Sequence, residues 1–268
     1  MSSLKQFSPG ELVRILEAST KVDGVFIVGG QAANIWANMF AKRNEALGKY
    51  GPFTSKDIDF FGTAEDAKRL AELIGATAET PSIDDNTPNS AKVTATIDGV
   101  ELIIDFVDHV IGIQDNHLKG RIVTLRLPTA DNTNFQELSI RLMHPIDCLA
   151  SRVANHKQLG RRDATASRQL KAAPHILREY IRSMIDAGEI RKAQRIIKRL
   201  TKYIRSDKNG RFIHKLDCDD PIEILQELEN DSRLDHRFRH YLGIWILEIQ
   251  GHRRNLDARL NPATALSN

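Results

Sequence analysis

The sequence predicts an α/β (α+β) protein in which a mixed sheet flanked by helices precedes a helical domain. An apolar segment at 25–30 ends in two glycines and is followed by a helical pattern, which predicts a buried strand that leads into a helix. An Asp-Gly pair at 98–99 separates two apolar runs, which is a strong hairpin signal. From residue 145 onward the apolar residues recur at helical spacing. We therefore expect two domains, over residues 1–144 and 145–268.

The first part of the chain predicts alternating helices and strands. Ser8 can cap a first helix, Pro9 suits its first position, and Glu11 completes a capping box. The segments that follow are predicted as a strand at 25–30, a helix at 31–41, a polar glycine-containing loop at 42–55 and a short strand at 56–62.

The next segments continue the mixed pattern. Thr63 lies three residues before Asp66 and Gly75 follows the apolar stripe, so residues 63–76 predict a capped helix. Residues 91–107 predict a hairpin, and weaker strand patterns follow at 121–127 and 137–143. The chain has no internal repeat, and the segment from 145 to the end is predicted to be helical.

Composition limits the class of protein. The chain has 268 residues, of which 41% are hydrophobic and 27% charged, as in a globular protein with a sizeable core. Cys148 and Cys218 are the only cysteines and have no metal-ligand spacing, so we expect neither disulfides nor zinc. Without a signal-peptide pattern or an apolar stretch of about 18 residues, the expectation is a cytoplasmic protein with no membrane partner.

Charge is distributed unevenly along the chain. Residues 1–120 contain 11 Lys or Arg against 17 Asp or Glu, a net of −6, whereas residues 151–215 contain 18 against 5, a net of +13. Residues 216–268 return to an acidic balance, with 6 against 10. The basic segment indicates a polyanionic partner, and solvated helix faces are the alternative.

The most basic predicted helix lies near residues 188–205. Its apolar residues form one stripe, and six basic residues cover the remaining surface. If the partner is RNA, such as a tRNA end, we expect phosphate contacts from the side opposite the stripe. The predicted contact residues are Arg195, Lys198, Arg199 and Lys202.

Three aspartates predict a metal site. Asp57 and Asp59 are two positions apart on a predicted strand, so their side chains share a face about 6–7 Å apart. Asp105 lies in an apolar strand that can pair beside them at about 4.8 Å. Because three such charges repel strongly without a cation, we expect Mg²⁺ (or Mn²⁺), which prefers hard oxygen ligands. A solvated strand end, or a structural role for Asp105, is the alternative.

The paired glycines acquire a function beside such a metal site. Without side chains at Gly29 and Gly30, the backbone N–H groups and the helix N-terminus can approach the phosphates of an NTP. A tight strand-to-helix turn is the alternative.

This ordered set resembles the DNA polymerase β-like nucleotidyltransferase superfamily, with closest likeness to AbiEii-like toxin nucleotidyltransferases. The matching pattern runs from Gly29-Gly30 through a helix and loop to Ser55-Lys56-Asp57-Ile58-Asp59, with Asp105 on a later strand. The resemblance covers residues 22–172 and implies a catalytic domain over 1–144 that binds an NTP, with Ser55 and Lys56 among the nucleotide-binding residues.

The resemblance continues in "DCLASRVANHKQLGRRD", which is similar to a helix and Arg-Asp pair of these toxins. It implies that Arg152, Lys157 and Asp163 contact the nucleotide. This sequence differs from the family pattern at one position of that helix. The family has a lysine there, whereas this chain has Arg152, and Lys157 is the nearest lysine that could replace it from a shifted position. Membership of a toxin–antitoxin or phage-defence system, with a cognate antitoxin as partner, is a further implication.

The expected activity is transfer of a nucleoside monophosphate from an NTP to an acceptor, with release of pyrophosphate. Asp105 would be a third metal ligand or the base that takes the acceptor's proton. The alternative is a non-catalytic nucleotide- or RNA-binding module with the same fold. His236 and His240 lack a nearby zincin glutamate, and the chain contains no P-loop, G-x-S-x-G or G-x-G-x-x-G motif.

Overall fold

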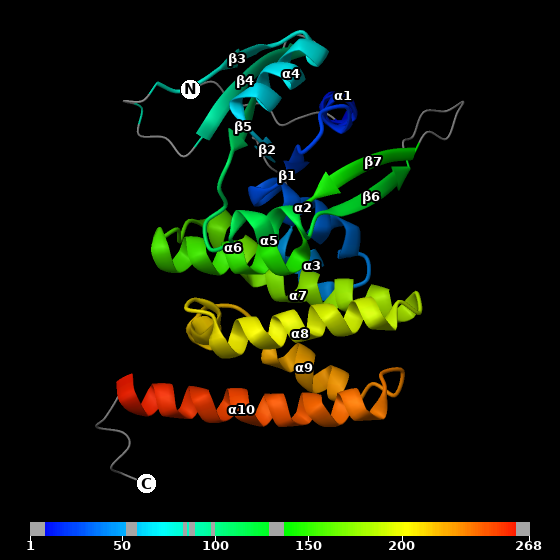
Figure 1. Ribbon diagram of the computed structural model, residues 1–268, viewed down its shortest axis with the longest axis vertical. Helices are drawn as coiled ribbons and strands as arrows, with labels where there is room; N and C mark the ends of the chain where they lie inside the picture. Colours follow the sequence, from blue (N-terminus) through cyan, green and yellow to red (C-terminus); the bar gives the residue numbers. More distant parts are fainter. Residues whose placement is uncertain are drawn as a thin grey trace. The chain divides into compact units, whose positions relative to one another are not determined.

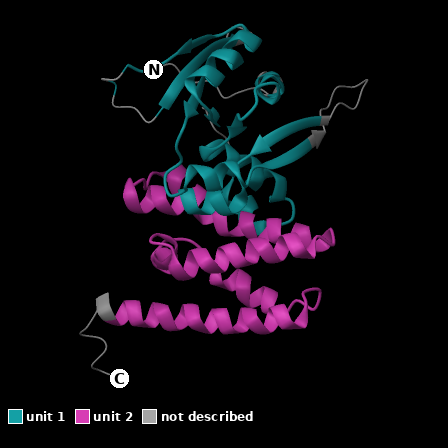
Figure 2. Ribbon diagram, viewed as in Figure 1, with its two compact units in different colours: residues 1–151 teal, residues 152–268 magenta. Residues whose placement is uncertain are grey.

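The structure, a computed structural model, divides the chain into two compact units, residues 1–151 and 152–268 (Figure 2). The division falls inside the helix Pro145–Gln158 (α6), a few residues beyond the boundary expected near 144. The residues that the structure describes are 9–51, 58–82, 85, 89–97, 100–128 and 137–260.

A seven-stranded mixed sheet forms the centre of the first unit, in the order β3-β4-β5-β2-β1-β7-β6 (Figure 1). Pairs β2·β5 and β1·β7 are parallel, and the other neighbours are antiparallel. The predicted mixed α/β class is therefore confirmed. The strands are β1 (Phe26–Ile27), β2 (Ile58–Phe61), β3 (Thr77–Glu79), β4 (Asn89–Ile97), β5 (Val100–Val107), β6 (Val123–Pro128) and β7 (Glu137–Leu142).

The central strands β4, β5 and β2 bury one face and leave the other half-buried. On β5, Ile104 and Phe106 are fully buried, while Asp105 between them is half-buried. On β2, Ile58 and Phe60 are likewise buried on either side of half-buried Asp59. This alternation has the strand period of two, so the apolar residues form the core face and both aspartates lie on the opposite face.

The helices of the first unit confirm most of the sequence signals. The capping box of Thr63 and Asp66 begins α4, and Gly75 ends it in the left-handed conformation at φ 67°. Trp36 of α2 is fully buried, and its Nε1 donates to the Met143 carbonyl at 2.9 Å. The helices are α1 (Pro9–Thr20), α2 (Gly29–Phe40), α3 (Glu45–Tyr50), α4 (Ala64–Ile74), α5 (Asp115–Lys119) and the beginning of α6.

Three short elements differ from the sequence-based expectation. The predicted loop at 42–55 contains α3, because the Asn44 side chain accepts from the Leu47 N–H and Leu47 is fully buried. Strand β3 and helix α5 were not predicted either. With three and five residues, these elements are too short to show a hydrophobic period.

Helices make up the described part of the second unit. They are the rest of α6, α7 (Ala164–Asp186), α8 (Ile190–Ser206), the 3₁₀ helix η1 (Gly210–Lys215), α9 (Ile222–Glu229) and α10 (His236–Leu260). The apolar stripe of α8 is buried as predicted, with Ile197 and Leu200 fully covered. Within the described residues, no helix has the length and apolarity to cross a membrane.

Acidification should destabilise the second unit. His175 on α7 is buried, and this burial lowers its pKa although Asp219 lies 3.1 Å from Nε2. The unfolded chain therefore takes up a proton more readily, and stability falls as pH drops below the unfolded pKa of about 6.5. We expect a loss of at most about 1.4 kcal/mol per pH unit from this residue. Thermal melts of wild type and His175→Gln between neutral and mildly acidic pH test this, and equal pH slopes would contradict it.

Candidate functional site

The Asp59 side chain lies at the N-terminus of α2. Gly30 N donates to Asp59 Oδ2 at 3.3 Å, and Val28 N donates to the Asp59 carbonyl at 2.9 Å. Val28 occupies the N-cap position and provides no side-chain cap. Since the first N–H groups of a helix have no intrahelical partner, Asp59 supplies an acceptor from another strand, and its negative charge suits the helix dipole.

This contact explains the glycine at position 29. Gly29 has φ +62°, in the left-handed region that side chains disfavour. A Cβ at this position would also overlap the Asp59 carboxylate. Glycine is therefore required twice here, once for backbone conformation and once to let Asp59 approach the helix.

The second aspartate lies on the neighbouring strand, at the register position of the first. Asp59 on β2 and Asp105 on β5 are register partners in a parallel pair, so both project from the same face of adjacent strands. Asp105 Oδ1 accepts from Asn89 Nδ2 at 2.8 Å. The structure thus brings together two of the three predicted metal ligands, whereas Asp57, Ser55 and Lys56 lie outside the described residues.

A lysine that sequence reasoning missed lies on the same face. Lys92 on β4 is the register partner of Asp105, and Glu79 on β3 is the register partner of Lys92. Glu79, Lys92, Asp105 and Asp59 therefore form a charged row across four neighbouring strands. A cation beside Asp105 lowers the cost of holding two carboxylates on one face. In the sequence, the only indication of this neighbour was the alternating strand pattern around Lys92. Such a pattern does not show which residue of the adjacent strand lies opposite.

The carboxylate pair fits a hard divalent cation. Mg²⁺ is held in proteins by one or two carboxylates, with water and substrate phosphate as the remaining ligands. Asp59 and Asp105 provide such a donor set on the rigid centre of the sheet. No group of three or more His, Cys, Asp or Glu suited to a metal occurs among the described residues, which do not include Asp57.

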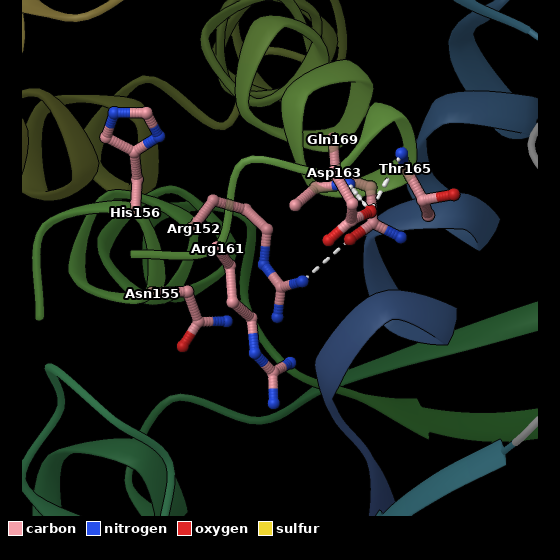
Figure 3. A pocket seen from close by; sticks show the side chains of 8 residues that line it. Arg152, Asn155, His156, Arg161, Asp163, Thr165 and Gln169 are labelled. Carbon is pink, nitrogen blue, oxygen red and sulfur yellow. Dashed lines mark hydrogen bonds between the residues drawn. The ribbon is translucent and has the colours of Figure 1, made fainter. Parts of the chain in front are cut away.

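A second polar site lies within the second unit, where α6 ends and α7 begins (Figure 3). Its cavity has a volume of about 150 Å³ and is lined by Arg152 and Asp163 of the predicted residues. Arg152 is buried, and its Nη1 donates to Gln169 Oε1 at 2.7 Å. The guanidinium groups of Arg152 and Arg161 extend to the same side (Figure 3). With two arginines against one carboxylate, Asp163, the lining has an excess of positive charge.

Asp163 has a structural function in this cavity. Its Oδ1 accepts from the N–H groups of Thr165 and Ala166 at 3.0 and 2.9 Å, so it is the N-cap of α7. The Ala166 amide is the main cause that lowers the pKa of this exposed carboxyl. Asp163 therefore caps α7 in the structure. Asn155, His156, Arg161 and Gln169 also line the cavity but were not predicted, because their convergence depends on the turn between the helices.

Lys157 lies elsewhere in the second unit. Its Nζ is 3.8 Å from the centroid of the Phe212 ring and 3.4 Å from the Lys208 carbonyl oxygen. Burial and the nearby Arg211 lower its pKa. Lys157 is not among the residues that line the Arg152 cavity, because it follows Arg152 by five positions and projects from another side of α6.

The predicted basic residues of α8 are all exposed. Arg195, Lys198, Arg199 and Lys202 face away from the buried stripe, and Lys198 also lies over the Phe238 ring at 5.9 Å. Together with Arg191, positions 195, 198 and 202 repeat at intervals of four, three and four, which places them in one line along the helix. This line is opposite the buried residues.

No protein-family model, no curated protein and no solved structure matches this chain. Its function is therefore inferred from the chemistry of these residues.

The contact between Asp59 and α2 makes a prediction about stability. Gly29→Ala should cost about 1–2 kcal/mol for the backbone conformation and further free energy for overlap with Asp59. Gly24→Ala is the matched control, because Gly24 has φ +82° but nothing within 4 Å of its Cβ position. Denaturant unfolding should show a larger loss for Gly29→Ala.

The double variant Gly29→Ala/Asp59→Ala separates the two contributions. Without the carboxylate, the cost of alanine at 29 should fall to that of Gly24→Ala. An unchanged cost would show that the carboxylate does not determine the glycine.

Proposed function

We propose that this protein is a metal-dependent nucleotidyltransferase that moves a nucleoside monophosphate from an NTP to an acceptor and releases pyrophosphate. The single observation that carries the proposal is the pairing of Asp59 with Asp105 in register on β2 and β5, beside the N-terminus of α2. Acidic side chains next to a helix N-terminus combine a cation site with a phosphate site.

Asp59 and Asp105 would hold Mg²⁺ (or Mn²⁺), with Asp57 as the third predicted ligand. The bound cation would neutralise phosphate charge and make an acceptor hydroxyl easier to deprotonate. Asp105 serves either as a ligand or as the base that takes the acceptor's proton, and Asn89 orients it through the 2.8 Å hydrogen bond.

The N-terminus of α2 would bind the triphosphate. Its N–H groups and dipole favour negative charge, and the bare backbone at Gly29 and Gly30 permits close approach. Asp59 already accepts from Gly30 N, so the carboxylate and the phosphate-binding backbone are held in one fixed arrangement. Such preorganisation lowers the cost of binding a charged substrate.

Within the second unit, Arg152 is the residue best suited to contact phosphate. An arginine in a cationic cavity binds phosphate through two parallel hydrogen bonds, and Gln169 holds the Arg152 side chain in place. Asp163 contributes by fixing the first turn of α7 at the cavity wall. Lys157, with its amino group on Phe212, is a weaker candidate for this nucleotide contact.

RNA is the acceptor class that the basic surface of α8 favours. Four cations in line along one exposed helix face suit a phosphate backbone, as at the end of a tRNA. A role as the toxin of a toxin–antitoxin or phage-defence pair, neutralised by a cognate antitoxin, agrees with this activity and with the resemblance to AbiEii-like proteins.

Transfer assays test the proposed chemistry. Each α-labelled NTP is incubated with the protein, Mg²⁺ and total bacterial RNA or lysate, and the labelled product is identified. Asp59→Asn and Asp105→Asn should each lower transfer by about 100-fold or more while the fold is retained. Asp108→Asn is the matched control, because Asp108 is exposed just beyond β5. NTP binding without transfer under any condition would instead support a non-catalytic binding module.

The RNA surface has its own test. Changing Lys198, Arg199 and Lys202 to Gln should weaken RNA binding and reduce the slope of log affinity against log salt by about 2, as expected for three lost phosphate contacts. The control changes Lys42, Lys68 and Arg69 to Gln. These cations of the first unit are also exposed, but they are not part of the proposed RNA surface of α8. Filter binding over a salt series measures both slopes, and identical curves for the two triple variants would exclude α8 as the RNA surface.

A further inference from the structure

A cationic cavity in the second unit is not used by the proposed reaction. It has a volume of about 230 Å³ and is lined by residues of the C-terminal part of α8, of η1 and of α10. Its polar lining consists of Arg205, Arg211, His252, Arg253 and Asn255. The rest of the lining is apolar, so none of the residues lining the cavity carries a carboxylate.

Two of the arginines are held in position by carboxylates outside the lining. Arg253 donates to both oxygens of Asp220, with Nη2 2.9 Å from Oδ1. Arg205 Nη1 donates to Glu248 Oε2 at 2.8 Å. A guanidinium group has five N–H donors, so each arginine keeps donors for a further anion after such pairing. The paired carboxylates fix the direction in which those donors point.

The donors of Arg253 are not all used within the protein. Its Nε is buried and has no hydrogen-bond partner among the described residues. This nitrogen has almost no accessible surface, so it does not face the cavity. The donors that remain for an anion are the unused N–H groups of Nη1 and Nη2.

Arg211 is oriented by an aromatic ring. Its guanidinium carbon is 4.9 Å from the centroid of Phe212, and no ion pair joins Arg211 to another described residue. The charge of this region also affects its neighbours. Burial is the main cause that lowers the pKa of Lys157 and of His214. The second cause is the charge of Arg211 for Lys157 and the charge of Arg253 for His214. Arg211 and Arg253 therefore lie close enough to affect these neighbouring groups, while Asp207 acts on the pKa of Lys157, and Asp257 and Asp220 on that of His214, in the opposite direction.

We propose that this cavity binds a terminal phosphate group, through Arg205, Arg211 and Arg253. A terminal phosphate carries about −1.5 to −2 charges at neutral pH and has three acceptor oxygens, which match three guanidinium donors. A phosphodiester in a nucleic-acid backbone offers one charge and two such oxygens. Arginine favours phosphate because its planar fork can donate two parallel hydrogen bonds.

The cavity size restricts what enters. A volume of about 230 Å³ is below the roughly 300–1,000 Å³ typical of sites that enclose a whole small-molecule ligand. The phosphate group is therefore enclosed, and the rest of the ligand extends outward past the exposed side chains of His252 and Asn255. Free pyrophosphate and the 5′-phosphate of an RNA end both present this chemistry.

Calorimetric titration of the full chain with pyrophosphate, in EDTA and at constant ionic strength set by chloride, tests the site. Chelation keeps metal from Asp59 and Asp105, so the result does not depend on the proposed reaction. Arg211→Gln should weaken binding at least about 10-fold, since it removes charge-assisted hydrogen bonds. Arg211→Lys keeps the charge but loses the fork, so we expect intermediate affinity.

Arg237→Gln is the matched control, because Arg237 is an exposed arginine of α10 outside the cavity. It should leave pyrophosphate affinity unchanged. Pyrophosphate binding that is equal in wild type and Arg211→Gln, or absent from wild type, would overturn the proposal.

RNA titrations distinguish the two sources of phosphate. A short single-stranded RNA is compared with and without its 5′-phosphate. Tighter binding of the phosphorylated form, lost in Arg211→Gln, would support recognition of a chain end. Pyrophosphate binding without this RNA preference would support a free anion. Loss of affinity in Arg211→Gln for the unphosphorylated RNA alone would assign the arginines to the nucleic-acid backbone and overturn the proposal.

Discussion

The contact between the Asp59 carboxylate and the first turn of α2 is the constraint on which the candidate active site depends. It joins the second strand of the sheet to the helix that follows the first strand, through the Gly30 N–H. It also determines why Gly29 has no side chain. One interaction therefore accounts for the position of a carboxylate, the start of a helix and the identity of a glycine. The same arrangement leaves a helix N-terminus beside acidic groups, which is the electrostatic requirement for binding metal and phosphate together.

The parallel pairing of β2 with β5 gives the site its second carboxylate. Asp59 and Asp105 are register partners, and Lys92 and Glu79 extend the row across β4 and β3. Lys92 and Glu79, which have opposite charges, therefore continue the row beyond Asp105 on the side away from β2, on the face opposite the core residues Phe60 and Phe106. A rigid, buried face on one side keeps the charged face in a fixed geometry, which is what a catalytic metal site requires.

Arginines dominate the second unit and have different roles there. Arg178 and Arg182 pair with glutamates of α9 and contribute to packing. Arg152 donates to the uncharged Gln169 side chain, and the Arg211 guanidinium lies over the Phe212 ring. The basic composition of this segment thus separates into structural ion pairs and cationic cavities. In the cavity beside α10, Arg205 and Arg253 are paired with carboxylates as well, but each keeps N–H donors for a further anion.

The sequence by itself determined the mixed α/β class, the hairpin strands, the capping box of α4 and the amphipathic pattern of α8, because each is a local signal within one segment. It also indicated Asp59 and Asp105 as partners. Tertiary structure alone decided the register that places Lys92 beside Asp105 and the overlap that requires glycine at 29. These depend on which residues far apart in the chain become neighbours. Spacing along one segment cannot show that, because a shift of one residue in strand register moves every side chain to the other face.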